Sequence, residues 1–389
     1  MERLSVGACV KVLSSVLVPL SLLAASPATA SEDPKPRITG PHMHQNLSIY
    51  FIHGPSKPGP IPLTLDEALA TGAATVFETG QVRRLVLQNT SDREVFVQAG
   101  DIVKGGRQDR VLTVSLLIPP KAKNVPIGAY CVEQGRWRRR GNESMGNFQS
   151  AKNILPLKAA KLAIFAAPIQ PALPPPQRVQ SGAARPQIQQ QRIVSAANRP
   201  RLPNLDGGVS DNGRTQTRQQ RVWASVGAMQ EQLSRNLDAR VQSEKSKSSL
   251  QLTLENKKLK AARHDLIKAL KSKAMASPDI VGYAFAINGR LNSASVYPSN
   301  GLFVKMWPRL LEASAIEAIA EMAKTKAVAQ PSAGDVTAFL DAARKAPATS
   351  TDDLDGRFNR QTREAKNKGV YLATVRRDGF VVHETYIAH

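Results

Sequence analysis

The sequence predicts an α+β protein, and three observations support this prediction. Short β runs broken by turns fill residues 46–164, as in an antiparallel sandwich or barrel. The composition of residues 165–218 cannot form a core. Beyond them, helical periodicity alternates with two hairpin signals. We therefore expect a β-sandwich-like antiparallel domain over 46–164, a flexible linker over 165–218 and an α+β domain with hairpins and helices over 219–389.

Residues 1–30 have the pattern of a secretory signal peptide. Arg3 and Lys11 make the start positive, the apolar run VLSSVLVPLSLLAA follows, and the tripeptide ATA provides a small-x-small cleavage site. The apolar run is too short for a comfortable membrane span, although an uncleaved N-terminal anchor is the alternative, and no later segment is apolar enough to cross a bilayer. We expect a mature chain that begins near Ser31 and is periplasmic or secreted.

The β-rich part begins with NLSIYFIHG (46–54), a strand-like run. LTLDEALATG (63–72) predicts one short helix, because Thr64 can cap it, Glu67 lies three residues on and Gly72 can end it. Further strands are expected at 82–89, 94–100, 111–120 and 125–133.

Residues 165–218 contain PPP, QIQQQ, seven arginines and no lysine. This composition predicts a basic, partly polyproline and mostly disordered segment. It is either a solvated spacer or a segment that holds an acidic polymer.

Helical periodicity starts after this segment. A first helix is predicted by apolar residues at 222, 226, 229, 233 and 237, and a second by 259, 262, 266 and 270. Residues 280–297 predict a hairpin that turns at Asn288-Gly289, and the last hairpin turns at Asp378-Gly379. Between the hairpins we expect a helix from Phe303 with a kink or new start at Pro308, then helices at 312–327 and 334–346.

The formal charge of +22 favours anionic partners, either a small molecule or an envelope polymer. Aromatic residues make up only 5% of the chain and no nucleic-acid motif is present. After signal cleavage Cys131 is the one remaining cysteine, so no internal disulfide is expected, and we interpret it as a buried side chain on a strand.

The segment GDIVKGGRQDRVL (100–112) is the first candidate site. It lacks the spacing of a Walker loop or a dinucleotide fingerprint, and it runs from strand to loop to strand. Its two central glycines can expose backbone N–H groups to an anion, or they can simply form a charged hairpin turn. The ligand-binding candidates here are Lys104, Gly105, Gly106, Arg107, Gln108 and Arg110.

The segment CVEQGRWRRRG (131–141) is the second candidate, and adjacent hairpins of one sheet can bring it to the first. Arginine suits carboxylates and phosphates, and tryptophan offers a stacking face. The ligand-binding candidates here are Gln134, Arg136 and Trp137, and the acid/base candidates across both segments are Asp101, Asp109 and Glu133.

The histidines provide only a weak metal pattern. His42 and His44 lie near the mature N-terminus and His53 follows, but the spacing fixes no complete ligand set. We therefore predict no metal site, and no motif identifies a cofactor.

Three segments resemble the ADP-ribosylglycohydrolase- and rhodanese-phosphatase-associated protein domain: QAGDIVKGGRQDRVLTVSLLIPP, CVEQGRW and AINGRLNSASVYPSNGLFVKMWPRLL. The resemblance runs from about residue 46 to about residue 320, interrupted at 165–218. The family has no established activity, and its name implies gene neighbourhoods with ADP-ribose and phosphotyrosine-type chemistry. Its pattern falls on Asp101, Gly106, Gln108, Arg110 and the segment Cys131–Trp137.

Three functions follow from these observations as hypotheses. The first is binding of a phosphate- or sugar-containing anion in a cleft that joins the two candidate segments. The second is a hydrolase or transferase for an ADP-ribose-like or phosphorylated substrate. The third is an envelope-associated structural protein that holds anionic polymer through its basic linker.

Overall fold

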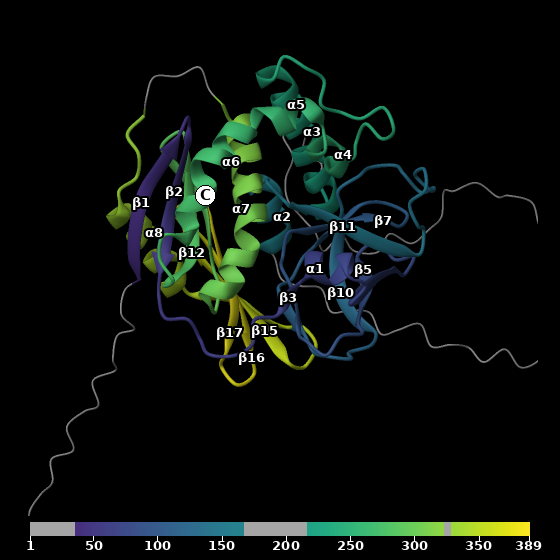
Figure 1. Cartoon of the computed structure of the whole chain (residues 1–389), viewed down its shortest axis with the longest axis horizontal. Helices are drawn as coiled ribbons and strands as arrows, with labels where there is room; N and C mark the ends of the chain where they lie inside the picture. Colours follow the sequence, from purple (N-terminus) through teal and green to yellow (C-terminus); the bar gives the residue numbers. More distant parts are fainter. Residues whose placement is uncertain (1–35, 167–215, 323–327) are drawn as a thin grey trace, which may run out of the picture. The chain divides into compact units, whose positions relative to one another are not determined.

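The computed structural model describes residues 36–166, 216–322 and 328–389. The predicted signal peptide and most of the predicted linker lie outside these residues. The described residues form an eight-stranded sheet, a closed six-stranded barrel, a three-stranded sheet and the helices that pack on them (Figure 1). The α+β class is therefore confirmed. Six strands of the predicted β-rich part close into a barrel instead of forming a sandwich, whereas residues 47–53 of that part join the eight-stranded sheet.

The eight-stranded sheet is antiparallel throughout and is built mostly from the C-terminal part of the chain. Both predicted hairpins are in it, and Asn288 and Gly289 have the positive φ values, 51° and 73°, that their turn requires. Its strands, in order across the sheet, are β1 (Arg37–His44), β2 (Leu47–His53), β12 (Ile280–Ile287), β13 (Arg290–Val296), β17 (Val381–Ala388), β16 (Gly369–Arg376), β15 (Phe358–Ala365) and β14 (Ala348–Asp353).

Two helices cover opposite faces of this sheet. Side chains alternate along β2, so that Ile49 and Phe51 enter the core that also holds Trp307 of α7 (Asn300–Ala320). Tyr50 and Ile52 enter a second core with Phe339 of α8 (Ala333–Lys345). Helix α7 packs on β12 and also on β11 of the barrel, so it links the two β structures (Figure 1).

The barrel strands pair antiparallel in a closed ring. In order around the ring they are β10 (Val125–Cys131), β5 (Arg84–Asn89), β4 (Ala74–Glu78), β11 (Asn147–Ile154), β7 (Asp101–Gly105) and β8 (Arg110–Leu112). The small third sheet has the order β3 (Leu63–Thr64), β6 (Val95–Val97) and β9 (Leu116–Ile118).

The predicted short helix is α1 (Leu65–Ala70), and Thr64 and Glu67 form its capping box. The predicted second helix divides at Arg263, and α7 continues through Pro308 without a break. The remaining helices are α2 (Lys158–Phe165), α3 (Arg218–Asn236), α4 (Leu250–Leu254), α5 (Lys257–Ala262), α6 (His264–Leu270) and the 3₁₀ helix η1 (Lys271–Met275).

Candidate functional site

The two candidate segments meet at one end of the barrel. The end of β10 lies beside the start of β8, where Cys131 pairs with Arg110. Just beyond it, the side-chain amide of Gln108 donates to the backbone carbonyl of Glu133 at 2.8 Å. The turn between β7 and β8 and the loop after β10 are therefore in direct contact.

Behind this turn, six charged side chains form a buried ion cluster. None of these side chains is more than 7% exposed. The cluster joins strand β4, the β7–β8 turn, the start of β8 and the loop after β10. Its members are Glu78, Asp109, Arg110, Glu133, Arg136 and Arg140.

Arg140 is central to the buried ion cluster. Its two terminal nitrogens contact the two carboxylate oxygens of Asp109, each at 2.9 Å, and Nη1 also lies 3.2 Å from Glu133 Oε1. Burial alone lowers the pKa of Arg140, but its hydrogen bonds to Asp109 and Glu143 raise that pKa above the ordinary value. Arg136 completes the arrangement through Nε, which donates to Glu133 Oε2 at 2.7 Å.

These contacts determine what the two acid/base candidates can do. Asp109 and Glu133 lie close together, as a pair of catalytic carboxyl groups would. Each, however, is hydrogen-bonded to buried guanidinium groups, and Asp109 also accepts from the backbone N–H of Gly105 at 3.1 Å. The charges are compensated within the protein, which is the arrangement expected of a structural ion network.

Arg110 is also structural in this arrangement. Its side chain is fully buried, its Nη1 donates to the carbonyl of Gln108 at 2.8 Å, and its Nη2 lies 3.5 Å from Glu78. The surface anion contact that we expected for Arg110 is therefore not available to it in this geometry.

Asp101 lies away from the other two carboxylates. It begins β7, whereas Asp109 follows the other end of that strand. Its carboxylate accepts from Arg309 of α7 at 2.7 Å and from the backbone N–H of Gln98 at 2.9 Å. Burial raises the pKa of Asp101, and Arg309 opposes that shift. The structure therefore pairs Asp101 with α7 and does not place it in the buried ion cluster.

The solvent-facing part of the site is a groove, which we call the Trp137 groove. It has a volume of about 700 Å³, within the range of small-molecule sites. The loop after β10 forms one wall and the turn before α4 forms the other. The lining residues are Gln134 to Arg140 and Glu244 to Ser248.

Four of the predicted ligand-binding residues are at or near this groove. Trp137 is 50% exposed and the Arg107 guanidinium lies over its ring, 5.9 Å from the centroid. Gln134 is exposed, while Arg136 lines the groove from its buried position in the cluster.

The remaining candidates have other partners. Lys104 pairs with Glu255 at 2.9 Å. Gly105 and Gly106 form the turn with φ values of 114° and 53°, and both are buried. Gln108 is buried and accepts the thiol hydrogen of Cys131, for which burial raises the pKa to about 11. The thiol is thus held protonated inside the barrel, as predicted for a structural cysteine.

Of the three histidines in the weak metal pattern, His53 is held by hydrogen bonds. His53 Nδ1 lies 2.8 Å from Asp279, and its Nε2 lies 2.9 Å from the Thr39 hydroxyl. Within residues 36–166, 216–322 and 328–389, no group of three or more potential ligand side chains is placed to hold a metal ion. The same residues contain no helix with the length and apolarity that a membrane span requires.

Sequence reasoning missed several residues of this site. Arg140 was not among the candidates, although it lies in the segment CVEQGRWRRRG. Ser249 donates to Asp109 at 2.9 Å, and Ser248 exchanges hydrogen bonds with the backbone of Gln134. Nothing in the sequence near Glu78 or these serines indicates that they approach the loop.

One comparison with known proteins gives a match. The profile of the ARG and Rhodanese-Phosphatase-superfamily-associated Protein domain, ARPP-1, matches residues 35–164 and 183–387. No curated protein and no solved structure matches the chain significantly. The matched ranges cover most of the chain and include every residue of the buried ion cluster and of the Trp137 groove.

Proposed function

We propose that this chain, which belongs to the ARG and Rhodanese-Phosphatase-superfamily-associated Protein family, binds a phosphate- or sugar-containing anion in the Trp137 groove. The observation that carries the proposal is the set of exposed cations around an exposed aromatic ring. Arg138, Arg139, Lys245 and Lys247 are all exposed and all line the groove. Its one acidic lining residue, Glu244, already pairs with Arg240 at 2.8 Å.

The side-chain chemistry suits a ligand with both charge and a flat or apolar face. Arginine binds phosphate or carboxylate oxygens in a bidentate manner, and lysine adds point charge. The ring of Trp137 offers a stacking surface to a sugar or a base. An exposed tryptophan is also a place where binding energy concentrates, since tryptophan and arginine dominate interaction hot spots.

The buried ion cluster supports this function because it holds the loop that carries Trp137 in place. It fixes both ends of the loop that carries Trp137, because Arg136 and Arg140 are held while Arg138 and Arg139 face solvent. Ser248 joins the other wall to the backbone of Gln134 at 2.7 and 3.1 Å. Because the backbone of both walls is held in this way, the loss of conformational entropy on binding is confined mainly to the exposed side chains.

The hydrolase or transferase alternative receives less support. A general acid or base must be free to exchange a proton with a substrate. Asp109 and Glu133 are instead engaged by guanidinium groups, and Asp101 is paired with Arg309. The third hypothesis rests on the basic segment 165–218, most of which lies outside the described residues.

Export stays a prediction that rests on the first thirty residues. N-terminal sequencing of the expressed protein should return a chain that begins near Ser31. Recovery of an intact Met1 from a cytosolic fraction would contradict it.

Fluorescence titration tests the binding proposal directly. The chain has three tryptophans, and Trp137 is 50% exposed whereas Trp307 is fully buried. Pyrophosphate, a nucleoside monophosphate and a sugar phosphate are the ligands to titrate. We expect saturable quenching by at least one of them, and the double variant Lys245→Ala/Lys247→Ala should weaken that affinity by roughly tenfold or more.

A matched control separates the groove from general electrostatics. Lys257→Ala/Lys258→Ala removes the same charge from exposed positions of α5 that do not line the groove. The control should bind as the natural protein does. Equal weakening in both double variants, or no saturable quenching by any ligand, would reject the site.

A further inference from the structure

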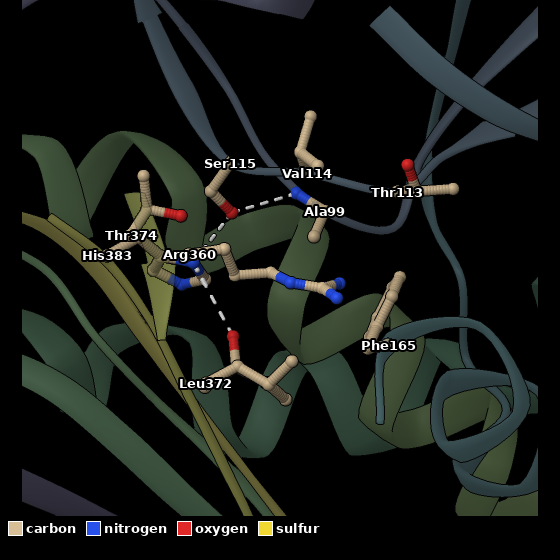
Figure 2. Close-up of a pocket in the computed structure, with 10 residues that line it drawn as sticks. Ala99, Thr113, Val114, Ser115, Phe165, Arg360, Leu372, Thr374 and His383 are labelled. Carbon is tan, nitrogen blue, oxygen red and sulfur yellow. Dashed lines mark hydrogen bonds between the residues drawn. The ribbon is translucent and has the colours of Figure 1, made fainter. Parts of the chain in front are cut away.

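A second cavity, which shares no lining residue with the Trp137 groove, lies between the eight-stranded sheet and the barrel segment. We use the term barrel segment for residues 63–154, which contain the barrel and the three-stranded sheet. It has a volume of about 20 Å³, which exceeds the roughly 10–15 Å³ that a single water molecule requires. Ala99 and Thr113 to Ser115 line one side, Phe165 at the end of α2 lines another, and strands β15 to β17 supply the rest (Figure 2). The lining residues on these strands are Arg360, Leu372, Thr374, His383 and Thr385.

The lining is rich in hydrogen-bond donors. One guanidinium, one imidazole and four hydroxyl groups line the cavity, and none of its ten lining residues within the described chain is acidic. Figure 2 shows the side chain of Arg360 extending toward Phe165 across this space. Arg360 is 3% exposed and pairs with Asp352 at 2.9 Å.

His383 adds a ring nitrogen, Nε2, that has no hydrogen-bond partner among the described residues. The Ser115 hydroxyl oxygen accepts from the backbone N–H of Ala99 at 3.0 Å, so its hydrogen is free to be donated to His383 Nδ1 at 2.9 Å. With Nδ1 accepting from Ser115, we assign the remaining proton of the neutral imidazole to Nε2. That atom is buried with no hydrogen-bond partner among the described residues. A buried N–H without a partner is costly, which makes an unseen partner at this place favourable.

The electrostatic surroundings of the cavity favour a negatively charged partner. Burial lowers the pKa of Arg360, and the nearby positive charge of Arg218 lowers it further, against the opposing effect of Asp352. Burial also lowers the pKa of His383 to about 3, so the imidazole is neutral at ordinary pH. A negative charge beside Arg360 would stabilise its guanidinium, while a neutral imidazole can still donate one hydrogen bond.

We propose that this cavity is a binding site for one small monovalent anion, of the size of chloride or formate, held by Arg360, His383 Nε2 and the threonine hydroxyls of β16 and β17. The size of the cavity excludes nucleotides and sugar phosphates, and no residue lines both this cavity and the Trp137 groove. An anion here contacts both the barrel segment and the sheet, and it therefore stabilises their junction.

The stability of the protein in different sodium salts tests this proposal. Chloride, bromide, formate and gluconate are compared at one ionic strength, with gluconate as an anion too large to enter. We expect the melting temperature to rise with the logarithm of the concentration of a small anion that binds, because a ligand that binds only the folded state stabilises it by mass action.

Variants of nearly the same side-chain volume distinguish specific anion binding from the general effects of salts. Thr374→Val/Thr385→Val deletes two lining hydroxyls at nearly constant volume, and it should raise the apparent anion dissociation constant roughly tenfold. Thr362→Val is the control, because Thr362 is a buried threonine of the same sheet that does not line the cavity. The control should keep the full response to small anions.

Diffraction from crystals grown in bromide gives an independent result. An anomalous peak within hydrogen-bond distance of Arg360 and His383 is expected. Ordered water with no anomalous signal, together with a salt response that is the same in gluconate and in both variants, would overturn the proposal.

Discussion

At the scale of single residues, the loop after β10 puts arginine to two uses within five positions. Arg136 and Arg140 are buried and neutralise carboxylates, whereas Arg138 and Arg139 face solvent in the Trp137 groove. The same residue type thus holds the loop in place and supplies positive charge to the groove surface. The partners decide which use applies, because Arg136 and Arg140 reach Glu133 and Asp109 whereas Arg138 and Arg139 are exposed.

Replacement of Arg140 with alanine should destabilise the protein strongly. Asp109 and Glu133 would keep their burial but lose a shared partner, and breaking a buried ion pair in this way costs about 3–5 kcal/mol. Arg138→Ala, two positions away at an exposed site, should change the free energy of unfolding by less than about 0.5 kcal/mol. Urea denaturation of the two variants measures both values.

Ligand binding distinguishes the Arg138→Ala variant, which the stability measurement does not. Arg138→Ala should weaken anion binding in the Trp137 groove while leaving stability unchanged. If Arg140→Ala unfolds at the same urea concentration as the natural protein, the buried ion cluster contributes no net stability and our account of the loop fails.

At the scale of elements, the β7–β8 turn depends on its second glycine. Gly106 has a φ of 53°, and a Cβ at this position would lie 2.3 Å from a ring atom of Phe148 and 2.9 Å from Glu78 Oε2. Gly106→Ala should therefore cost about 2–4 kcal/mol, from the left-handed backbone and from overpacking together.

Gly135→Ala provides the matched comparison. Gly135 also has a positive φ, 82°, but a Cβ there would meet nothing within 4 Å. Only the backbone term of about 1 kcal/mol should remain. Thermal unfolding of the two variants distinguishes the terms, and equal losses of stability would show that the contact with Phe148 is unimportant.

The elements that the sequence predicted are those with strong local signals. Thr64 and Glu67 mark the start of α1, and Asn288-Gly289 marks the β12–β13 turn. Strands β14 and β15 were missed because their pattern does not alternate apolar and polar residues in the usual way. In β15 the inward positions after Phe358 are Arg360 and Thr362, so a buried strand has a polar sequence.

The candidate site was predicted only in part, because its local sequence signals are strong but its long-range contacts leave no signal in the sequence. The two segments contain the right residues and do meet, since arginine, tryptophan and glycine are conspicuous in the sequence. The burial of the charged side chains in these segments was not predictable. Glu78 reaches the site from β4, and Ser249 reaches it from the start of α4. Contacts between residues so far apart in sequence exist only after the barrel has closed.

At the scale of the whole described structure, the junction between the sheet and the barrel segment contains both apolar and polar contacts. Helix α7 packs on both through apolar side chains, while Ser115 and His383 join them through a buried hydrogen bond of 2.9 Å. His383 also packs against Tyr297, with ring centroids 4.8 Å apart. Because this contact involves a buried histidine, we expect the stability of the junction to depend on pH.

This dependence gives a prediction for the global stability. Burial lowers the pKa of His383 to about 3 in the folded state, below the value of 6.5 for an unperturbed histidine. The unfolded chain therefore binds the proton first, and the stability that is present above pH 6.5 is lost as the pH falls toward 3. Between pH 7 and pH 5 this one group should lower the free energy of unfolding by about 2 kcal/mol.

The variant His383→Asn tests this assignment, because asparagine can keep an acceptor toward Ser115 but does not titrate. Its free energy of unfolding, measured in urea at several pH values, should fall less between pH 7 and pH 5 than that of the natural protein, by the amount due to His383. His264→Asn, at an exposed position of α6, should leave the slope unchanged. Carboxylates whose pKa is raised by burial, such as Asp101, contribute equally to the slope of the variant and of the natural protein, so the difference between the two slopes reports His383. A slope that is the same in His383→Asn and in the natural protein would show that His383 does not link the junction to pH.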